Sequence, residues 1–75
     1  MTTGGIPRVT ARELLAALQR TGFSVVRSKG SHVRLRHPDG RAVTIPVHPG
    51  DLRVGTIAAI LKAAQISPDE LRRLI

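Results

Sequence analysis

The chain has 75 residues and a formal net charge of +7. This length predicts one small domain, and the positive charge favours a polyanion such as a nucleic acid, or an acidic protein, as partner. The chain has no cysteine, which excludes disulfides, thiolate metal sites and a cysteine nucleophile. It has one phenylalanine and neither tyrosine nor tryptophan, so aromatic platforms for stacking bases are poorly supplied.

Residues 1–9 are predicted to be a flexible N-terminal lead, because glycine, proline and threonine dominate them. They lack a basic region followed by an apolar core, so no signal peptide is expected. No apolar run approaches the roughly 18 residues of a membrane span. We therefore expect a cytoplasmic protein without a membrane segment, whose single domain occupies residues 10–75.

The first predicted element is a helix over residues 10–21. Thr10 and Glu13 have the spacing of a capping box, in which each side chain accepts a hydrogen bond from the backbone of the other residue. Three leucines follow at helical spacing and form an apolar stripe. Gly22 suits the left-handed position just past the end of a helix.

Three strands are predicted next, over residues 23–28, 31–37 and 41–47. Lys29-Gly30 and Pro38-Asp39-Gly40 are typical of the turns between them. Pro46 has no backbone N–H to donate, so the third strand is expected at an edge of the sheet or to end there. Val43, Ile45 and Val47 are expected to share its apolar face.

Two further helices are predicted, over residues 56–64 and from Pro68 onward. Thr56 is a plausible cap for the first, and Ser67 with Pro68 and two acidic residues is a cap signature for the second. The resulting fold class is α+β. Its order is α-β-β-β-α plus a short C-terminal helix, with a three-stranded antiparallel sheet and helices on one face.

Positive charge is concentrated in residues 27–37. Within the second predicted strand, period two places His32, Arg34 and Arg36 on one face and Val33 and Leu35 on the other. A histidine can take up or release a proton near neutral pH. A histidine that lies among fixed positive charges suits the binding of RNA and general acid–base chemistry on the bound RNA.

Specific roles in RNA binding and chemistry are predicted for eight residues. His32 is the candidate general acid–base, although a lone histidine is more often an ordinary surface or core residue. The candidate RNA contacts, for each of which a solvated charge or simple turn chemistry is the alternative, are Lys29, Gly30, Ser31, Arg34, Arg36, Arg41 and His48. The three histidines lack zinc-ligand spacing, so neither a metal nor a cofactor is expected.

The chain also resembles the HicA family of toxins, also called YcfA-like proteins. The likeness covers about residues 10–72 and lies in the order of several short motifs rather than in one of them. These motifs are Gly22-Phe23, Arg27-Ser28-Lys29-Gly30-Ser31-His32, His37-Pro38-Asp39-Gly40-Arg41, Thr44-Ile45-Pro46-Val47-His48, Leu52-Arg53-Val54-Gly55-Thr56, Ile60-Leu61-Lys62 and Ile66-Ser67-Pro68-Asp69-Glu70.

The resemblance implies a double-stranded-RNA-binding-like fold and a metal-independent endoribonuclease that cleaves mRNA and arrests growth. It maps the family's catalytic histidine onto His32. It implies a HicB-type antitoxin that covers the active face, and we expect the free toxin to be a monomer. Many members carry a second histidine directly after the first, where this chain has Val33. Strand parity turns Val33 toward the helices, so the catalytic group should be retained.

Two other functions compete with the ribonuclease. One is a non-catalytic RNA-binding module that uses the same basic face without needing the histidine. The other is an interaction protein whose positive surface docks an acidic partner. Replacing His32 distinguishes the RNA-binding module from the ribonuclease, because only the ribonuclease needs the histidine. The salt dependence of binding distinguishes the interaction protein, because phosphate contacts weaken steeply with salt.

Overall fold

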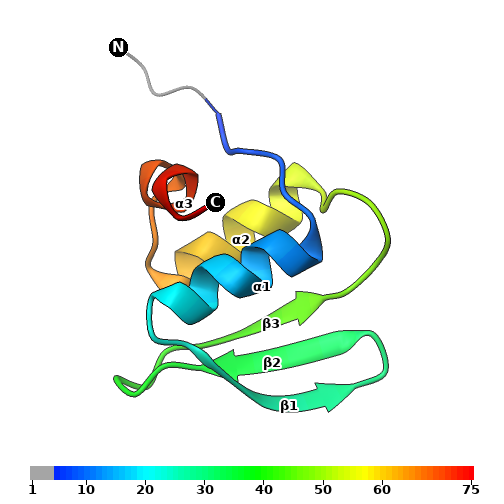
Figure 1. Ribbon diagram of the computed structural model, residues 1–75, viewed down its shortest axis with the longest axis vertical. Coiled ribbons are helices and arrows are strands. Elements are labelled where there is room, and N and C mark those ends of the chain that lie inside the picture. Colours follow the sequence, from blue (N-terminus) through cyan, green and yellow to red (C-terminus); the bar gives the residue numbers. More distant parts are fainter. Residues whose placement is uncertain (1–4) are drawn as a thin grey trace.

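The computed structural model of the chain describes residues 5–75. Its elements are α1 (Ala11–Arg20), β1 (Ser24–Lys29), β2 (His32–Arg36), β3 (Ala42–Pro46), α2 (Val54–Ala64) and α3 (Pro68–Leu74). The strands form an antiparallel sheet in the order β1-β2-β3, and the helices lie together on one side of it (Figure 1). The predicted α+β class and its order of elements are confirmed.

The core lies between the helices and the strands nearest to them. Leu35 of β2 and Ile45 of β3 are fully buried, together with Leu14 and Leu18 of α1 and Ile57 of α2. All six residues of β1 are exposed, because this strand lies farthest from the helices (Figure 1). The hairpin of β1 and β2 therefore extends beyond the helical layer and leaves much of its surface open to a partner.

The start of α1 is fixed by the predicted capping box. The Thr10 Oγ1 atom accepts a hydrogen bond from the Glu13 N–H at 3.1 Å, and Glu13 Oε1 accepts one from the Thr10 N–H at 2.9 Å. Val9 and Leu14 are fully buried at the two positions of a hydrophobic staple. Of the predicted lead, residues 1–4 lie outside the described residues, and Val9 is part of the core.

The start of α2 differs from the prediction. The helix begins at Val54, and Arg53 occupies its N-cap position without a side-chain hydrogen bond, so the expected cap at Thr56 is wrong. The reason is tertiary: Leu52 is buried, and its N–H donates to the Val9 carbonyl at 2.9 Å. This anchor brings the chain onto the core before Thr56, and the helix begins directly after it.

The predicted start of α3 is confirmed, whereas the predicted apolar face of β3 is confirmed only in part. The Ser67 side chain accepts a hydrogen bond from the Glu70 N–H at 3.0 Å, which confirms the predicted cap of α3. β3 is an edge strand that ends at Pro46, as predicted, but Val47 lies past its end and is 42% exposed. Among residues 5–75, no helix is both long and apolar enough to cross a membrane.

Candidate nucleic-acid interface

The face of the sheet that points away from the helices is built on β2. His32, Arg34 and Arg36 are exposed, whereas Val33 is half-buried and Leu35 is fully buried. The alternation predicted for this strand is therefore present. It follows from the pleat, which turns successive side chains to opposite faces.

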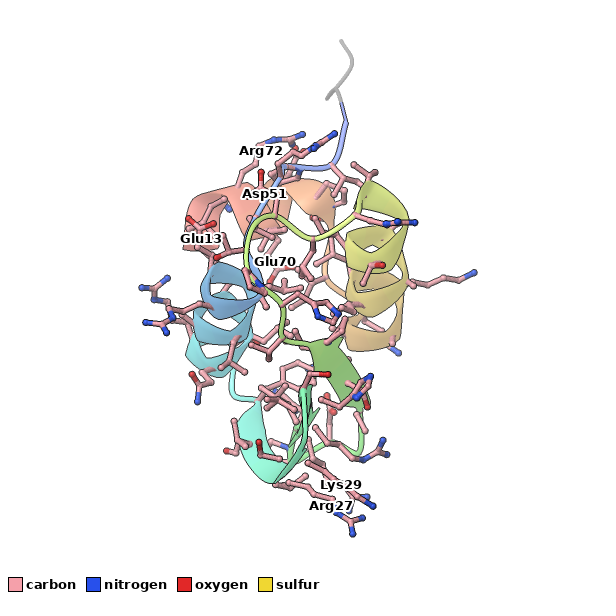
Figure 2. All side chains as sticks on the ribbon, turned by 90° about the vertical axis from the view of Figure 1, so that its right-hand side faces the viewer. Glu13, Arg27, Lys29, Asp51, Glu70 and Arg72 are labelled. Carbon is pink, nitrogen blue, oxygen red and sulfur yellow. The ribbon has the colours of Figure 1, made fainter. Side chains whose placement is uncertain are left out.

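β1 adds two more cations to the same face. Arg27 is the register partner of Arg34, and Lys29 is the partner of His32. Residues directly opposite each other in an antiparallel pair point to the same side of the sheet. Figure 2 shows Arg27 and Lys29 at the end of the molecule farthest from the helices. We call the set Arg27, Lys29, His32, Arg34 and Arg36 the basic face.

A bulge in β1 makes this set possible. Val25 pairs with Leu35 and Arg27 pairs with Arg34, so two steps along β1 correspond to one step along β2, and Val26 is the extra residue. Strict alternation would have put Arg27 and Lys29 on the side of Val25, toward the helices. The bulge resets the alternation, so that both cations join the side of His32.

Among residues 5–75, no ion pair joins a carboxylate to a residue of the basic face. None of the five Asp and Glu residues of the chain lies in a strand. In Figure 2, Glu13, Asp51 and Glu70 lie toward the helical end, opposite Arg27 and Lys29. Like charges placed directly opposite each other in a sheet destabilise it. The basic face thus carries positive charge without a carboxylate partner, and this charge favours the binding of a polyanion.

The turn between β1 and β2 fixes the place of His32. Lys29 pairs with His32, so Gly30 and Ser31 form a two-residue turn, with Gly30 at a φ of +58°. A positive φ at this position is typical of hairpin turns and is easily adopted only by glycine. Nothing lies within 4 Å of a Cβ built on Gly30. Glycine is thus needed here for backbone conformation, and the turn places His32 at the very start of β2.

His48 lies at the same end of the sheet as His32. Pro46 is the register partner of His32, and the Val47 N–H donates to the Ser31 carbonyl at 2.6 Å. His48 follows directly and is exposed. Residues Ser31, His32 and His48, which the sequence names as separate candidates, therefore gather where β2 begins and β3 ends.

Arg41 is engaged inside the fold. Its Nε atom donates to Asp39 Oδ2 at 2.9 Å, its guanidinium donates to the Ala64 carbonyl and lies 5.2 Å from the centre of the Phe23 ring. The side-chain hydrogen bond from Arg41, followed by the bond from its backbone N–H, lowers the pKa of Asp39 to about 2. Arg41 joins the β2–β3 turn to α2. The other predicted cations, Lys29, Arg34 and Arg36, are exposed, and the Arg34 guanidinium donates to Thr44 Oγ1 at 3.4 Å.

His37 belongs to the same cluster, which the sequence did not indicate. Its Nε2 atom lies 3.0 Å from the Thr21 carbonyl, and its Nδ1 atom accepts a hydrogen bond from the Asp39 N–H at 3.1 Å. The ring meets Phe23 edge-on, with 5.1 Å between centroids. His37 is half-buried. This histidine ties the end of α1 to the β2–β3 turn and is not part of the basic face.

Within residues 5–75, no group of three or more His, Cys, Asp or Glu side chains could hold a metal ion. The basic face offers one exposed histidine among four cations. Such a group can exchange a proton with a bound ligand while the cations bind phosphate oxygens.

Fold and interface together define a class: a small α+β domain of order α-β-β-β-α-α, whose open sheet face is basic and carries a histidine. A family model described as the HicA toxin of bacterial toxin–antitoxin systems matches residues 11–66 of the chain. That range holds the whole sheet and most of the 75 residues, so the protein belongs to the HicA toxin family. No curated protein matches the chain.

Proposed function

We propose that this toxin is an endoribonuclease that cleaves mRNA, with His32 as the general acid–base and the basic face as the phosphate-binding surface. The observation that carries the proposal is the placement of His32. It is exposed, directly opposite Lys29, and on the same side of β2 as Arg34. Family membership supports the role of a toxin.

The reaction needs a base, an acid and stabilisation of negative charge. The base removes the proton of a ribose 2′-hydroxyl, whose oxygen forms a new bond to the adjacent phosphorus. The bond from phosphorus to the 5′-oxygen breaks, and that oxygen takes up a proton. The products are a 2′,3′-cyclic phosphate and a 5′-hydroxyl end. Positive charge near the phosphate stabilises the charge that develops on its oxygens.

The cations divide into two groups. Arg27, Lys29, Arg34 and Arg36 extend from the open side of the sheet and are the proposed phosphate contacts. The turn of Gly30 and Ser31 contributes backbone groups beside His32. Arg41 contributes less to binding in this proposal, because its guanidinium already bonds Asp39 and the Ala64 carbonyl.

The proposed protein partner is a HicB-type antitoxin. Its inhibitory surface should be acidic, because the face that it has to cover carries four fixed cations and no carboxylate. Co-expression with the antitoxin should restore growth. Variants that remove charge from the basic face should bind the antitoxin more weakly, with the loss greatest at low salt.

The test compares wild type with His32→Ala on a defined mRNA in the presence of EDTA. Cleavage by wild type should persist under the chelator, and His32→Ala should lower it by roughly 10²- to 10⁴-fold. RNA retention and the unfolding midpoint should change little, because His32 is exposed. A matched RNA with 2′-deoxyribose at the cleavage site should bind but remain intact, because it lacks the attacking hydroxyl.

A non-catalytic RNA-binding module is the second candidate, and one observation favours it. Within residues 5–75, no hydrogen bond or ion pair orients the His32 ring, whereas catalytic histidines are commonly oriented by a third group. If wild type binds RNA but neither cleaves it nor arrests growth, and His32→Ala behaves identically, the ribonuclease proposal is wrong and the binding module stands.

A further inference from the structure

An open hollow of about 470 Å³ lies beside the His32 end of the sheet. Its walls come from the start of α1 and from the loop that follows β3. It is lined by Thr10, Ala11, Arg12, Val47, His48, Pro49 and Gly50. The volume falls within the range of about 300–1,000 Å³ that is typical of small-ligand sites.

The hollow is preformed, because its loop wall is fixed at both ends. At one end, the Val47 N–H donates to the Ser31 carbonyl of the β1–β2 turn at 2.6 Å. At the other, the Leu52 N–H donates to the Val9 carbonyl at 2.9 Å, and Thr10 forms a bridge with Asp51. The first of these anchors connects the loop wall of the hollow to the turn that precedes His32, and the second connects it to the start of α1.

The lining suits a flat, partly apolar group. Ala11, Val47 and Pro49 supply apolar surface, and His48 and Arg12 supply planar groups that are exposed. Single-stranded RNA is commonly held by stacking its bases on histidine rings, other aromatic rings or arginine guanidinium planes.

Few other ring side chains could serve this purpose. Phe23, the only phenylalanine of a chain without tyrosine or tryptophan, is 2% exposed. His37 packs edge-on against it and bonds the Thr21 carbonyl, so its ring is occupied. Of the remaining histidines, His32 lies on the basic face and His48 lines the hollow.

We propose that this hollow binds one unpaired base of the RNA, the base of a nucleotide next to the phosphate held at His32. His48 and Arg12 stack on it and determine which base is preferred. The inference rests on the proposed function in that the ligand is RNA, but it does not require cleavage. The register places Pro46 opposite His32, and His48 follows two residues later, so neighbouring nucleotides can reach both places.

The test uses the His32→Ala protein, which under the proposed function should leave the RNA intact, so that RNA binding is measured without cleavage. Its affinity is measured for a short single-stranded RNA and for a series in which one position at a time is abasic. At one position the missing base should weaken binding about fivefold to tenfold, as expected for one stacked base at an open site. Adding His48→Ala should remove this penalty without changing the salt dependence of binding.

Two conservative variants make the result specific. His48→Phe keeps a ring and should keep the abasic penalty. Arg12→Lys keeps the charge but loses the plane, so it should reduce the penalty while leaving the salt dependence unchanged. Lys62→Ala on α2 removes a cation far from the hollow in sequence and should leave the penalty intact.

The outcomes separate the two proposals. An abasic penalty that is equal in the presence and absence of His48 overturns the base site, and so does the lack of a penalty at every position. Loss of cleavage in His32→Ala with the penalty retained supports both proposals. Failure of wild type to bind any RNA overturns the proposed function and the base site together. For each variant, an unfolding midpoint equal to that of wild type excludes misfolding as the cause of a change in binding.

Discussion

Arg27 of β1 lies directly opposite Arg34 of β2, and both side chains belong to the face of the sheet that points away from the helices. Two guanidinium groups in such a position repel each other in the free protein. An RNA phosphate between them would relieve the repulsion. Under the proposed function, this pair would increase the affinity for RNA at some cost in folding stability.

The first prediction concerns this pair. Arg27→Ala should raise the free energy of unfolding by about 0.2–1 kcal/mol, because it removes a like-charge neighbour. The same change should weaken RNA binding and reduce the slope of log affinity against log salt by about 0.7, the value for one phosphate contact to single-stranded RNA. Urea unfolding and RNA titration at several salt concentrations measure the two effects.

Lys62→Ala is the control for Arg27→Ala, because it removes one positive charge from α2 rather than from the sheet. It should leave the salt slope near the wild-type value. Equal reductions of the slope by both variants would mean that net charge, and not the basic face, governs binding.

The second prediction concerns Gly22. This residue has a φ of +105°, and a Cβ built on it would lie 2.8 Å from His37 Nε2. Gly22→Ala combines an unfavourable backbone conformation with a clash against a ring that is itself bonded. It should destabilise the fold by roughly 1–3 kcal/mol.

Gly55 provides a matched control. It lies in the first turn of α2, its φ is not positive, and nothing lies within 4 Å of a Cβ built on it. Gly55→Ala should leave stability unchanged or raise it by up to about 1 kcal/mol. If Gly22→Ala were tolerated equally well, the contact between Gly22 and His37 would not constrain the junction of α1 and β1.

The two strands of the first hairpin show what the sequence can predict about a face. On β2 the apolar residues Val33 and Leu35 alternate with cations, so the pattern alone places His32 and Arg34 correctly. On β1 the pattern fails, because the bulge at Val26 is set by pairing with β2 and leaves no mark in the local sequence. Arg27, whose side of the sheet depends on this bulge, is not among the predicted RNA contacts.

The turn after β2 shows a second limit. Pro38-Asp39-Gly40 predicts the turn but not its contacts, which run from His37 to the end of α1 and from Arg41 to the end of α2. Such contacts join segments that are distant in sequence, and a charge or a histidine looks the same in sequence whether it is free or bonded. The sequence therefore predicts Arg41 as an RNA contact without indicating that its guanidinium is bonded within the fold.

The third prediction concerns acid stability. Arg41 holds the pKa of Asp39 at about 2, below the ordinary value of 3.8. Because the folded value is the lower one, the interaction stabilises the fold above about pH 4 and is lost as the pH falls toward 2. The unfolding midpoint of wild type should therefore fall over this range more steeply than that of Asp39→Asn.

A flat wild-type profile between pH 4 and 2, or an equally steep profile in Asp39→Asn, would show that the Asp39–Arg41 pair does not contribute to acid sensitivity. Asp51→Asn is the control, since it removes a carboxylate from an exposed loop position. Its profile should follow that of wild type.

The last prediction concerns the different roles of His32, at the start of β2, and His37, just after its end. His37→Ala leaves the Thr21 carbonyl and the Asp39 N–H without this partner and removes the edge contact with Phe23. It should destabilise the fold by roughly 1–3 kcal/mol. At temperatures where it remains folded, its RNA cleavage should stay within a few-fold of wild type, because the ring does not reach the basic face.

His32→Ala should show the opposite pattern, with an almost unchanged unfolding midpoint and a large loss of cleavage. His32 is exposed on the sheet, and its ring forms no hydrogen bond within residues 5–75, so the folded state loses little when the ring is removed. Thermal unfolding and single-turnover cleavage of both variants complete the comparison. If folded His37→Ala lost as much cleavage as His32→Ala, the assignment of the acid–base role to His32 alone would be wrong.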